Sequence, residues 1–288
     1  MNAIEIEGLT KSYGAFKLDG LDLTLPCGCI MGLVGENGAG KSTTIRLMLG
    51  MARPDGGTIC LRGRDGKELT RDEIGVVMDE VGITGCLTAE QLGRVMRGIY
   101  KSWDAAAYEG YIKILDIPRG KQFKDFSRGN KMKLGIAAAL SHGAKLLILD
   151  EATGGLDPVV RDTVLDILCD FTRDEEHSVL MSSHIVSDLE KACDYIAFLH
   201  KGRLLLCEEK DRLYEEYGIF RGTEAQLKLS PKAQRSGGDR QLEQEQKHAE
   251  SDEQQQPEPL AGRRGEGTEL EQAAEQQRLD DQAGRRNN

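Results

Sequence analysis

The stretch Gly35-Glu36-Asn37-Gly38-Ala39-Gly40-Lys41-Ser42-Thr43 decides the fold, because it matches the pattern G-x-x-x-x-G-K-[ST] at every fixed position. An apolar run at residues 29–34 precedes it as a buried strand does, and residues 44–50 follow with helical spacing and a final glycine. Glycines let the backbone curl so that successive N–H groups point at phosphate oxygens, and the next helix adds its positive end. Glycine-rich turns between a strand and a helix are common, but the Lys-Ser pair favours a phosphate-binding loop.

This loop predicts a site for a nucleoside triphosphate. We expect Lys41 to reach the β- and γ-phosphates and the Ser42 hydroxyl to bind Mg²⁺. The expected nucleotide-binding residues of the loop are Gly35, Asn37, Gly38, Gly40, Lys41, Ser42 and Thr43.

Composition narrows the class of protein. The chain has 288 residues, 39% of them hydrophobic, which is enough for one large core or two small ones. No run approaches the roughly 18 apolar residues of a membrane helix, and we expect no secretory leader at Met1. The seven cysteines form no C-x-x-C pair and suit buried thiols in a reducing cytosol rather than a metal site. A formal charge of −10 argues against nucleic acid as the main partner, and none is expected.

The last part of the sequence, residues 230–288, differs in kind from the rest. It carries nine Lys and Arg against thirteen Asp and Glu, and it has no Ile, Val, Phe, Tyr or Trp. Such a segment cannot bury enough apolar surface to offset its chain entropy, so we expect a low-complexity, disordered tail. The chemistry is therefore expected within residues 1–229.

Hydrophobic periodicity predicts alternating strands and helices. The expected strands are residues 3–8, 18–25, 29–34, 58–61, 74–78, 145–150, 178–183, 195–199 and 203–206. The expected helices are residues 44–50, 131–142, 158–171, 185–193 and 210–217, and residues 88–117 have helical spacing in two runs with a connection at Trp103. This order indicates an α/β fold with a mostly parallel core sheet, N-terminal antiparallel strands and a helical insert. Polar and apolar residues alternate around Ile4 and Ile6, which predicts that the first strand lies at the edge of a sheet. Within the helical insert, the Trp103 side chain is expected to fill space in the core.

A second motif follows the apolar run Leu146-Leu147-Ile148-Leu149. A buried strand that ends in carboxylates at the sheet's carboxyl edge is the Walker-B arrangement, in which Asp150 holds Mg²⁺ directly or through water. Glu151 comes one residue later, points the other way on a strand, and can polarise an attacking water. A strand that simply meets an acidic turn is the alternative, and the phosphate-binding loop argues against it.

Further motifs, in a fixed order, resemble ATP-binding-cassette (ABC) proteins. Phe126-Ser127-Arg128-Gly129-Asn130 stands where that family carries its signature loop, usually L-S-G-G-Q, and Gly155-Leu156-Asp157-Pro158 matches its D-loop. His184 matches the family's switch histidine, and Tyr13 matches the aromatic residue that stacks on adenine. The resemblance implies an ABC-type nucleotide-binding domain at residues 1–229, with a helical subdomain at about residues 86–135.

The resemblance also implies a site shared between two subunits in a head-to-tail dimer, formed by two copies of this chain or by one copy and a paralogue. Across ATP, Ser127 and Gly129 of one subunit would face the residues of the other that hold ATP, bind Mg²⁺ or act in catalysis. The residues with an implied catalytic role are Glu151, His184 and Lys41, and those with an implied metal role are Ser42, Asp150 and Asp79.

The sequence departs from the family pattern at three positions. Arg128 replaces the first signature glycine and places a guanidinium near the anion site. Asp79 stands where the family usually has the glutamine of its Q-loop, so a carboxylate replaces an amide that can donate a hydrogen bond. Ala152 replaces a proline that commonly follows the catalytic glutamate.

The Asp79 and Arg128 variants, together with Ile99-Tyr100-Lys101-Ser102-Trp103-Asp104, look like a Gram-positive exporter group implicated in peptide-antibiotic stress. The resemblance implies the ATPase subunit of an ABC transporter, attached to the cytoplasmic face of the plasma membrane through a separate permease. A soluble ABC ATPase acting on ribosomes or DNA is the alternative, but the chain has neither a second cassette nor a long coiled-coil insert. A regulatory subunit with a decayed ATPase is disfavoured because Lys41, Asp150 and Glu151 are all present.

Overall fold

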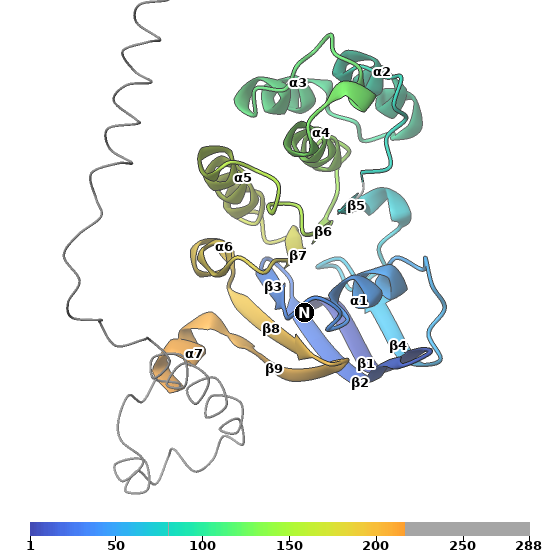
Figure 1. Cartoon of the computed structure of the whole chain (residues 1–288), viewed down its shortest axis with the longest axis vertical. Coiled ribbons are helices and arrows are strands. Elements are labelled where there is room, and N and C mark those ends of the chain that lie inside the picture. Colours follow the sequence, from blue (N-terminus) through green and yellow to red (C-terminus); the bar gives the residue numbers. More distant parts are fainter. Residues whose placement is uncertain (80, 217–288) are drawn as a thin grey trace, which may run out of the picture. The chain divides into compact units, whose positions relative to one another are not determined.

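The computed structural model describes residues 1–79 and 81–216, which form two sheets and the helices that cover them (Figure 1). The expected tail at residues 230–288 and the expected boundary at residue 229 lie outside this range and stay predictions. Within the described part, no helix is both long enough and apolar enough to cross a membrane.

The larger sheet has six strands in the order β5-β6-β7-β3-β8-β9. Their bounds are β3 Ile30–Val34, β5 Ile74–Val77, β6 Leu146–Asp150, β7 Ser178–Ser182, β8 Tyr195–His200 and β9 Arg203–Glu209. All neighbours pair in parallel except β8 and β9, which form an antiparallel hairpin. Every residue of β6 and β7 is buried, because the sheet is covered on both faces. The mostly parallel core sheet predicted from the sequence is confirmed.

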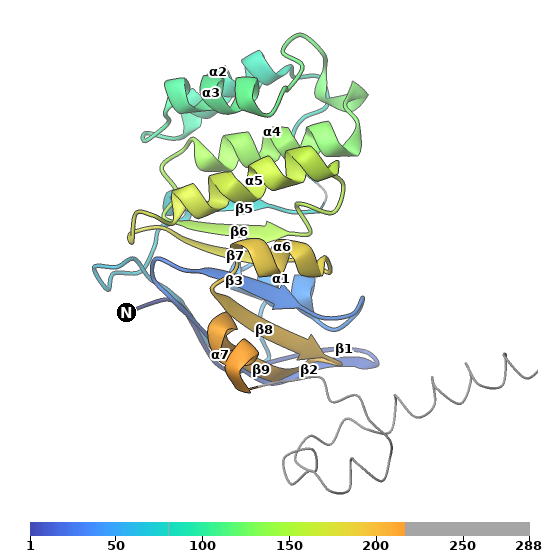
Figure 2. The same cartoon turned by 90° about the vertical axis from the view of Figure 1, so that its left-hand side faces the viewer.

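The helices are α1 Lys41–Met48, α2 Ala89–Ile99, α3 Ala105–Ile114, α4 Arg128–Leu140, α5 Pro158–Phe171, α6 Val186–Ala192 and α7 Lys210–Glu216, with short 3₁₀ turns η1 Arg71–Glu73 and η2 Phe123–Asp125. Side chains alternate along β6, so Leu147 and Leu149 join one core and Leu146 and Ile148 join another. The first core includes residues of α2 to α6, and the second includes α1 and the smaller sheet. Figure 2 shows α4 and α5 above β5 and β6.

The smaller sheet corrects one expectation about β1. Its order is β2-β1-β4, with bounds β1 Asn2–Tyr13, β2 Phe16–Pro26 and β4 Gly56–Leu61, so β1 is the central strand and not an edge strand. Ile4 pairs with Leu25 on one side and with Leu61 on the other. Alternation of polar and apolar residues reports which face of a strand is buried, but it does not report whether one or both backbone edges are paired.

The start of α4 also differs from the expectation of a helix beginning at Lys131. The helix begins at Arg128, and the Ser127 hydroxyl caps it by accepting a hydrogen bond from the Asn130 N–H at 3.2 Å. Gly129 and Asn130 are weak helix formers, which hides the first turn in a periodicity search, while serine is a preferred N-cap. The predicted signature motif is therefore the first turn of a helix.

The helical insert has the expected position between β5 and β6, and it contains α2, α3 and α4. Asp104 starts α3 by accepting hydrogen bonds from the N–H groups of Ala106 and Ala107. Trp103 lies in the connection between α2 and α3, partly buried against the core, with its ring centroid 4.9 Å from that of Tyr108. Its expected role as core filler is confirmed.

Candidate nucleotide-binding site

The loop between β3 and α1 borders a pocket of about 440 Å³. The pocket is lined by Phe16, Glu36, Asn37, Gly38, Gly40, Lys41, Ser42, Thr43, Asp79 and Glu151. Gly40, the N-cap of α1, has a φ of 117°, a conformation that glycine adopts readily. The first N–H groups of a helix have no partner within it, so the start of α1 offers donors and a positive helix end to an anion in the pocket.

Gly35 lies beneath this pocket and does not line it. A Cβ atom at Gly35 would lie 2.3 Å from the Leu199 carbonyl oxygen, so only glycine lets the loop approach β8 this closely. Its carbonyl oxygen accepts a hydrogen bond from the Lys41 ammonium. The role of Gly35 in this structure is therefore to shape the loop and hold the lysine.

The Lys41 side chain is buried, with 6% of its surface exposed. Its Nζ donates to the carbonyl oxygens of Gly35 at 2.6 Å and Glu36 at 3.4 Å, and it lies 3.5 Å from Glu151 Oε1. A buried ammonium group is stable only where oxygens satisfy its charge and its donors. These contacts keep the positive charge at the pocket, where phosphate oxygens can take the place of the carbonyls.

Asp150 ends β6 and is almost completely buried, at 2% exposure. The Ser182 hydroxyl, on the neighbouring strand β7, donates to Asp150 Oδ1 at 2.7 Å and accepts from the Glu151 N–H at 2.9 Å. Ser182 was not a candidate from the sequence. The sequence shows only a serine at the end of a buried strand. The register between β6 and β7 places this serine opposite Asp150.

Glu151 does not follow the strand alternation that we expected. Its φ is 52°, in the left-handed region, so the extended conformation ends at Asp150. The carboxylate lies between two other candidate residues: Oε2 is 2.7 Å from His184 Nδ1, and Oε1 is 3.5 Å from Lys41 Nζ. The structure thus brings the three expected catalytic residues together, with Lys41 and Glu151 in the pocket lining and His184 in contact with Glu151.

The expected metal residues supply only oxygen donors. They are the Ser42 hydroxyl and the Asp79 carboxylate in the pocket lining, and the Asp150 carboxylate, which is buried at the end of β6 outside that lining. The described residues contain no group of three or more His, Cys, Asp or Glu that could hold a metal by itself. Mg²⁺ prefers oxygen, keeps several waters and commonly takes one or two carboxylates together with substrate phosphates. The donor set fits Mg²⁺ that arrives with a triphosphate.

Two of the three residues that depart from the family pattern, Asp79 and Arg128, lie against each other. Asp79 lies two residues after the last residue of β5 and lines the pocket, and Arg128 is the first residue of α4. The Arg128 guanidinium donates to Asp79 Oδ1, and the two side chains form an ion pair that water can reach. The sequence indicated two separate departures from the family pattern, whereas the structure shows one contact.

Ser127 and Gly129 do not line the pocket of their own chain within the described residues. Gly129 packs against the loop that follows β6, because a Cβ atom there would lie 2.9 Å from the Gly155 carbonyl oxygen. This close contact gives Gly129 a structural reason to be glycine. A role of both residues toward a second subunit stays a prediction.

Tyr13 also lies outside the pocket lining, at the end of β1. Half of its surface is exposed, and Lys11 Nζ lies 5.3 Å from its ring centroid. The aromatic residue in the lining is Phe16, which pairs with Tyr13 across the turn between β1 and β2. Phe16 was missed because a sequence pattern alone does not show which of two nearby aromatic residues faces the loop.

Comparison with known proteins identifies the family. Residues 18–154 match the family described as ABC transporter. The bacitracin transport ATP-binding protein BcrA of Enterococcus faecalis is 34% identical over 76% of this chain and 75% of its own length. The lantibiotic transport ATP-binding protein SrtF of Streptococcus pyogenes is 34% identical over 72% of this chain and 91% of its own length. A solved ATP-binding subunit of an ABC transporter superposes with a TM-score of 0.67, at 25% identity, over 79% of this chain and 98% of that one.

The chain therefore belongs to the ABC transporter family, as an ATP-binding subunit that hydrolyses ATP. The predicted fold and the resemblance to Gram-positive proteins of antibiotic transport are confirmed. The relatives support a transporter ATPase and give no support to an ATPase acting on ribosomes or DNA.

Proposed function

We propose that this chain is the ATPase subunit of an exporter for peptide antibiotics. The placement of the Glu151 carboxylate between Lys41 and His184, at the wall of the phosphate pocket, carries the proposal. The substrate class follows from relatives that are bacitracin and lantibiotic transport proteins. Export implies a working position at the cytoplasmic face of the plasma membrane, where ATP is available.

In this proposal the chain's own residues bind the triphosphate and activate water. Lys41 and the N–H groups at the start of α1 bind the phosphates, which places the γ-phosphate near Glu151. The Glu151 carboxylate accepts a proton from water as the water oxygen bonds to phosphorus and the bond to the β-phosphate oxygen breaks, leaving ADP and phosphate. His184 holds the Glu151 carboxylate in place through Nδ1. Bound Mg²⁺ would neutralise phosphate charge, and Ser42, Asp79 and Asp150 are the residues to hold it.

A second ABC subunit would complete the site. Ser127 and Gly129 lie at the first turn of α4, where free N–H groups and the helix dipole favour an anion. Because neither residue lines the pocket of its own chain, they are available to a nucleotide held by another subunit. The second subunit is a copy of this chain or a paralogue.

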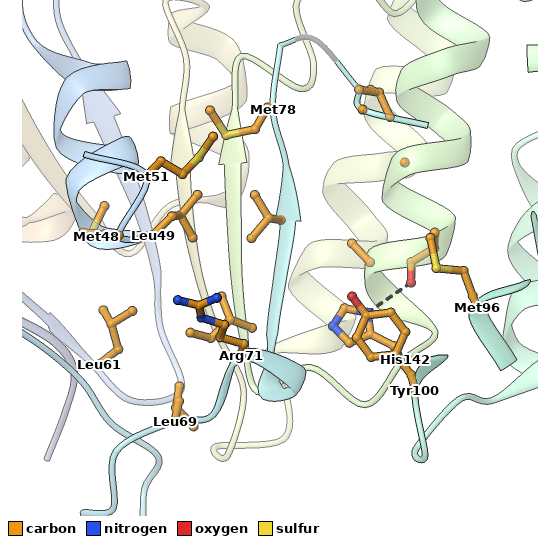
Figure 3. Close-up of a pocket in the computed structure, with 18 of the residues that line it drawn as sticks. Met48, Leu49, Met51, Leu61, Leu69, Arg71, Met78, Met96, Tyr100 and His142 are labelled. Atoms are coloured by element: carbon orange, nitrogen blue, oxygen red, sulfur yellow. Dashed lines mark hydrogen bonds between the residues drawn. The ribbon is translucent and has the colours of Figure 1, made fainter. Parts of the chain in front are cut away.

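The permease would dock in a groove beside the nucleotide pocket. The groove has a volume of about 720 Å³ and is lined mainly by apolar residues of the segment after α1, of β4, β5, α2 and α4. Figure 3 shows Met78 at the end of β5, with Met51 on one side of the strand and Tyr100 and His142 on the other. Met78 lines the groove, and the next residue, Asp79, lines the nucleotide pocket. A permease helix in this groove would therefore contact the strand that leads directly to the ATP site.

Substitution of one exposed groove residue tests this docking. Met51→Glu adds a charge to the groove, so we expect affinity for the permease to fall at least about tenfold, because a buried unpaired charge is costly. The permease is the polytopic protein that co-purifies with the tagged wild-type chain from membranes. Leu205→Glu is the matched control, because Leu205 on β9 is as exposed as Met51 (60% and 65%) but does not line the groove.

Equal loss of binding in both variants would contradict docking in the groove. A wild-type chain that hydrolyses ATP but binds no membrane protein would contradict the transporter function as a whole. Deletion of the chain should also increase the sensitivity of the cells to peptide antibiotics, and unchanged sensitivity would contradict the proposed substrate class.

A further inference from the structure

We propose that Arg128 is a positioning residue that acts through Asp79, so that the guanidinium of Arg128 and Mg²⁺-bound triphosphate compete for the Asp79 carboxylate. The pair joins the end of β5 to the first turn of α4. Asp79 also lines the nucleotide pocket together with Lys41 and Glu151. This inference rests on the proposed ATPase site and adds to it a residue that controls how the metal is bound.

The packing of α4 on β5 explains why the pair forms at this point. A Cβ atom at Gly75 would lie 3.0 Å from the Ala139 carbonyl oxygen, and one at Gly135 would lie 3.3 Å from Val77 Cγ1. The helix and the strand therefore approach closely at the turn of α4 that holds Gly135 and Ala139. The segment after β5 also lies close to α4, since a Cβ atom at Gly135 would be 3.2 Å from Val81 Cγ1, and the Asp79–Arg128 ion pair adds a polar contact between this segment and the first turn of the helix.

A second contact directs Arg128 toward Asp79. The aliphatic part of Arg128 passes over the loop after β6, where a Cβ atom at Gly155 would be 3.4 Å from both Cγ and Cδ of Arg128. With its stem placed on this loop, the guanidinium extends to the Asp79 carboxylate rather than into solvent. The arrangement depends on the particular pair of residues, because glycine at position 128 has no side chain to reach Asp79.

The Asp79–Arg128 ion pair is weak enough to be displaced. Both side chains are more than half exposed, at 62% and 52%, and an ion pair of this kind shifts an equilibrium by no more than about fivefold. A divalent cation that already contacts phosphate oxygens is a stronger partner for a carboxylate than an exposed guanidinium. The pair therefore moderates binding of Mg²⁺ and triphosphate without preventing it.

The position of the pair also connects the ATP site to the docking groove. Residues of both β5 and α4 line the groove, and the pair joins the same two elements at the pocket end.

Binding of a fluorescent, non-hydrolysable ATP analogue to the full chain, titrated with Mg²⁺, tests the proposal without relying on ATPase activity. We expect Arg128→Gln to lower the half-saturating Mg²⁺ concentration about threefold, because the competitor for Asp79 is removed. Arg128→Lys keeps the charge and should stay within about twofold of wild type. In an Asp79→Asn background, Arg128→Gln should cause no further change.

Arg94→Gln is the control for loss of an exposed guanidinium, since Arg94 pairs with Glu90 on α2 and both residues are exposed. The proposal is overturned if the Arg128→Gln shift persists in the Asp79→Asn background, or if Arg94→Gln produces the same shift. Failure of the wild-type chain to bind the ATP analogue at all would instead contradict the proposed function. The two failures are thus distinguishable.

Discussion

Glu151 is the residue on which hydrolysis should depend most strongly. Its carboxylate is held between His184 Nδ1 at 2.7 Å and Lys41 Nζ at 3.5 Å, and removal of a general base typically lowers a rate by about 10²–10⁴-fold. Glu151→Gln keeps the size of the side chain and removes the base. We expect kcat to fall by about this factor while ATP affinity stays within about threefold, as measured by phosphate release and by binding of a fluorescent ATP analogue.

Lys41→Ala provides the contrast for this residue. It removes the buried ammonium group at the phosphate loop, so nucleotide binding itself should be lost. If Glu151→Gln hydrolyses ATP at the wild-type rate, another group is the base, and His184 is the next candidate.

At the residue scale the sequence predicted the members of the site better than their contacts. The phosphate loop and the strand that ends in Asp150 have local patterns, so Lys41 and Asp150 could be found without a structure. The Ser182–Asp150 hydrogen bond and the Asp79–Arg128 pair join positions far apart in the chain. Such contacts depend on strand order and helix packing, which no local pattern reports.

At the element scale, Glu73 stabilises the start of β5. Its Oε2 accepts hydrogen bonds from the Thr70 N–H at 3.0 Å and the Thr70 hydroxyl at 2.9 Å, and its Oε1 lies 3.0 Å from Lys145 Nζ. The Thr70 N–H, followed by Lys145, holds the pKa of the Glu73 carboxyl below its usual range. The charged form is therefore favoured in the folded state, and one carboxylate joins the segment before β5 to the segment before β6.

Glu73→Gln should lower the free energy of unfolding by about 1 kcal/mol near neutral pH. Because the folded-state pKa is lowered, this contribution is fully present above the ordinary glutamate pKa and is lost as the pH falls through the lowered value. The difference in melting temperature between wild type and variant should thus stay near its full value from about pH 7 to about pH 5 and shrink as the pH falls from there to about pH 3.

Asp72→Asn is the control for Glu73→Gln, since Asp72 lies in the same 3₁₀ turn and makes no side-chain hydrogen bond or ion pair in the part of the chain that the structure describes. A difference that stays constant across this pH range would exclude the carboxylate as the cause.

The order of strands and helices was largely predictable, because buried strands and amphipathic helices have different hydrophobic periods. Two element-scale expectations failed for physical reasons. The central position of β1 depends on pairing along both backbone edges, which side-chain alternation does not encode. The start of α4 at Arg128 depends on a serine cap that outweighs the low helix propensity of Gly129 and Asn130.

At the scale of the whole molecule, the proposed dimer should form when ATP binds and part when it is hydrolysed. Glu151→Gln blocks the second step, so this variant should show an ATP-dependent doubling of mass in light scattering. Lys41→Ala should remain monomeric with ATP, because no nucleotide is held to join the subunits. A Glu151→Gln chain that binds ATP yet stays monomeric would contradict dimerisation of this chain with itself.

Mixed dimers decide whether each ATP site is built from two subunits. Ser127→Asp keeps an N-cap for α4 but places a negative charge beside the phosphates, and Lys41→Ala removes the phosphate lysine. In a shared-site dimer, placing the two changes in different subunits damages one site twice and leaves the other intact, so hydrolysis should persist. Placing both changes in one subunit damages both sites, so hydrolysis should be nearly lost. If each site lies within one chain, the two arrangements would give the opposite result, because only the second leaves one subunit unchanged.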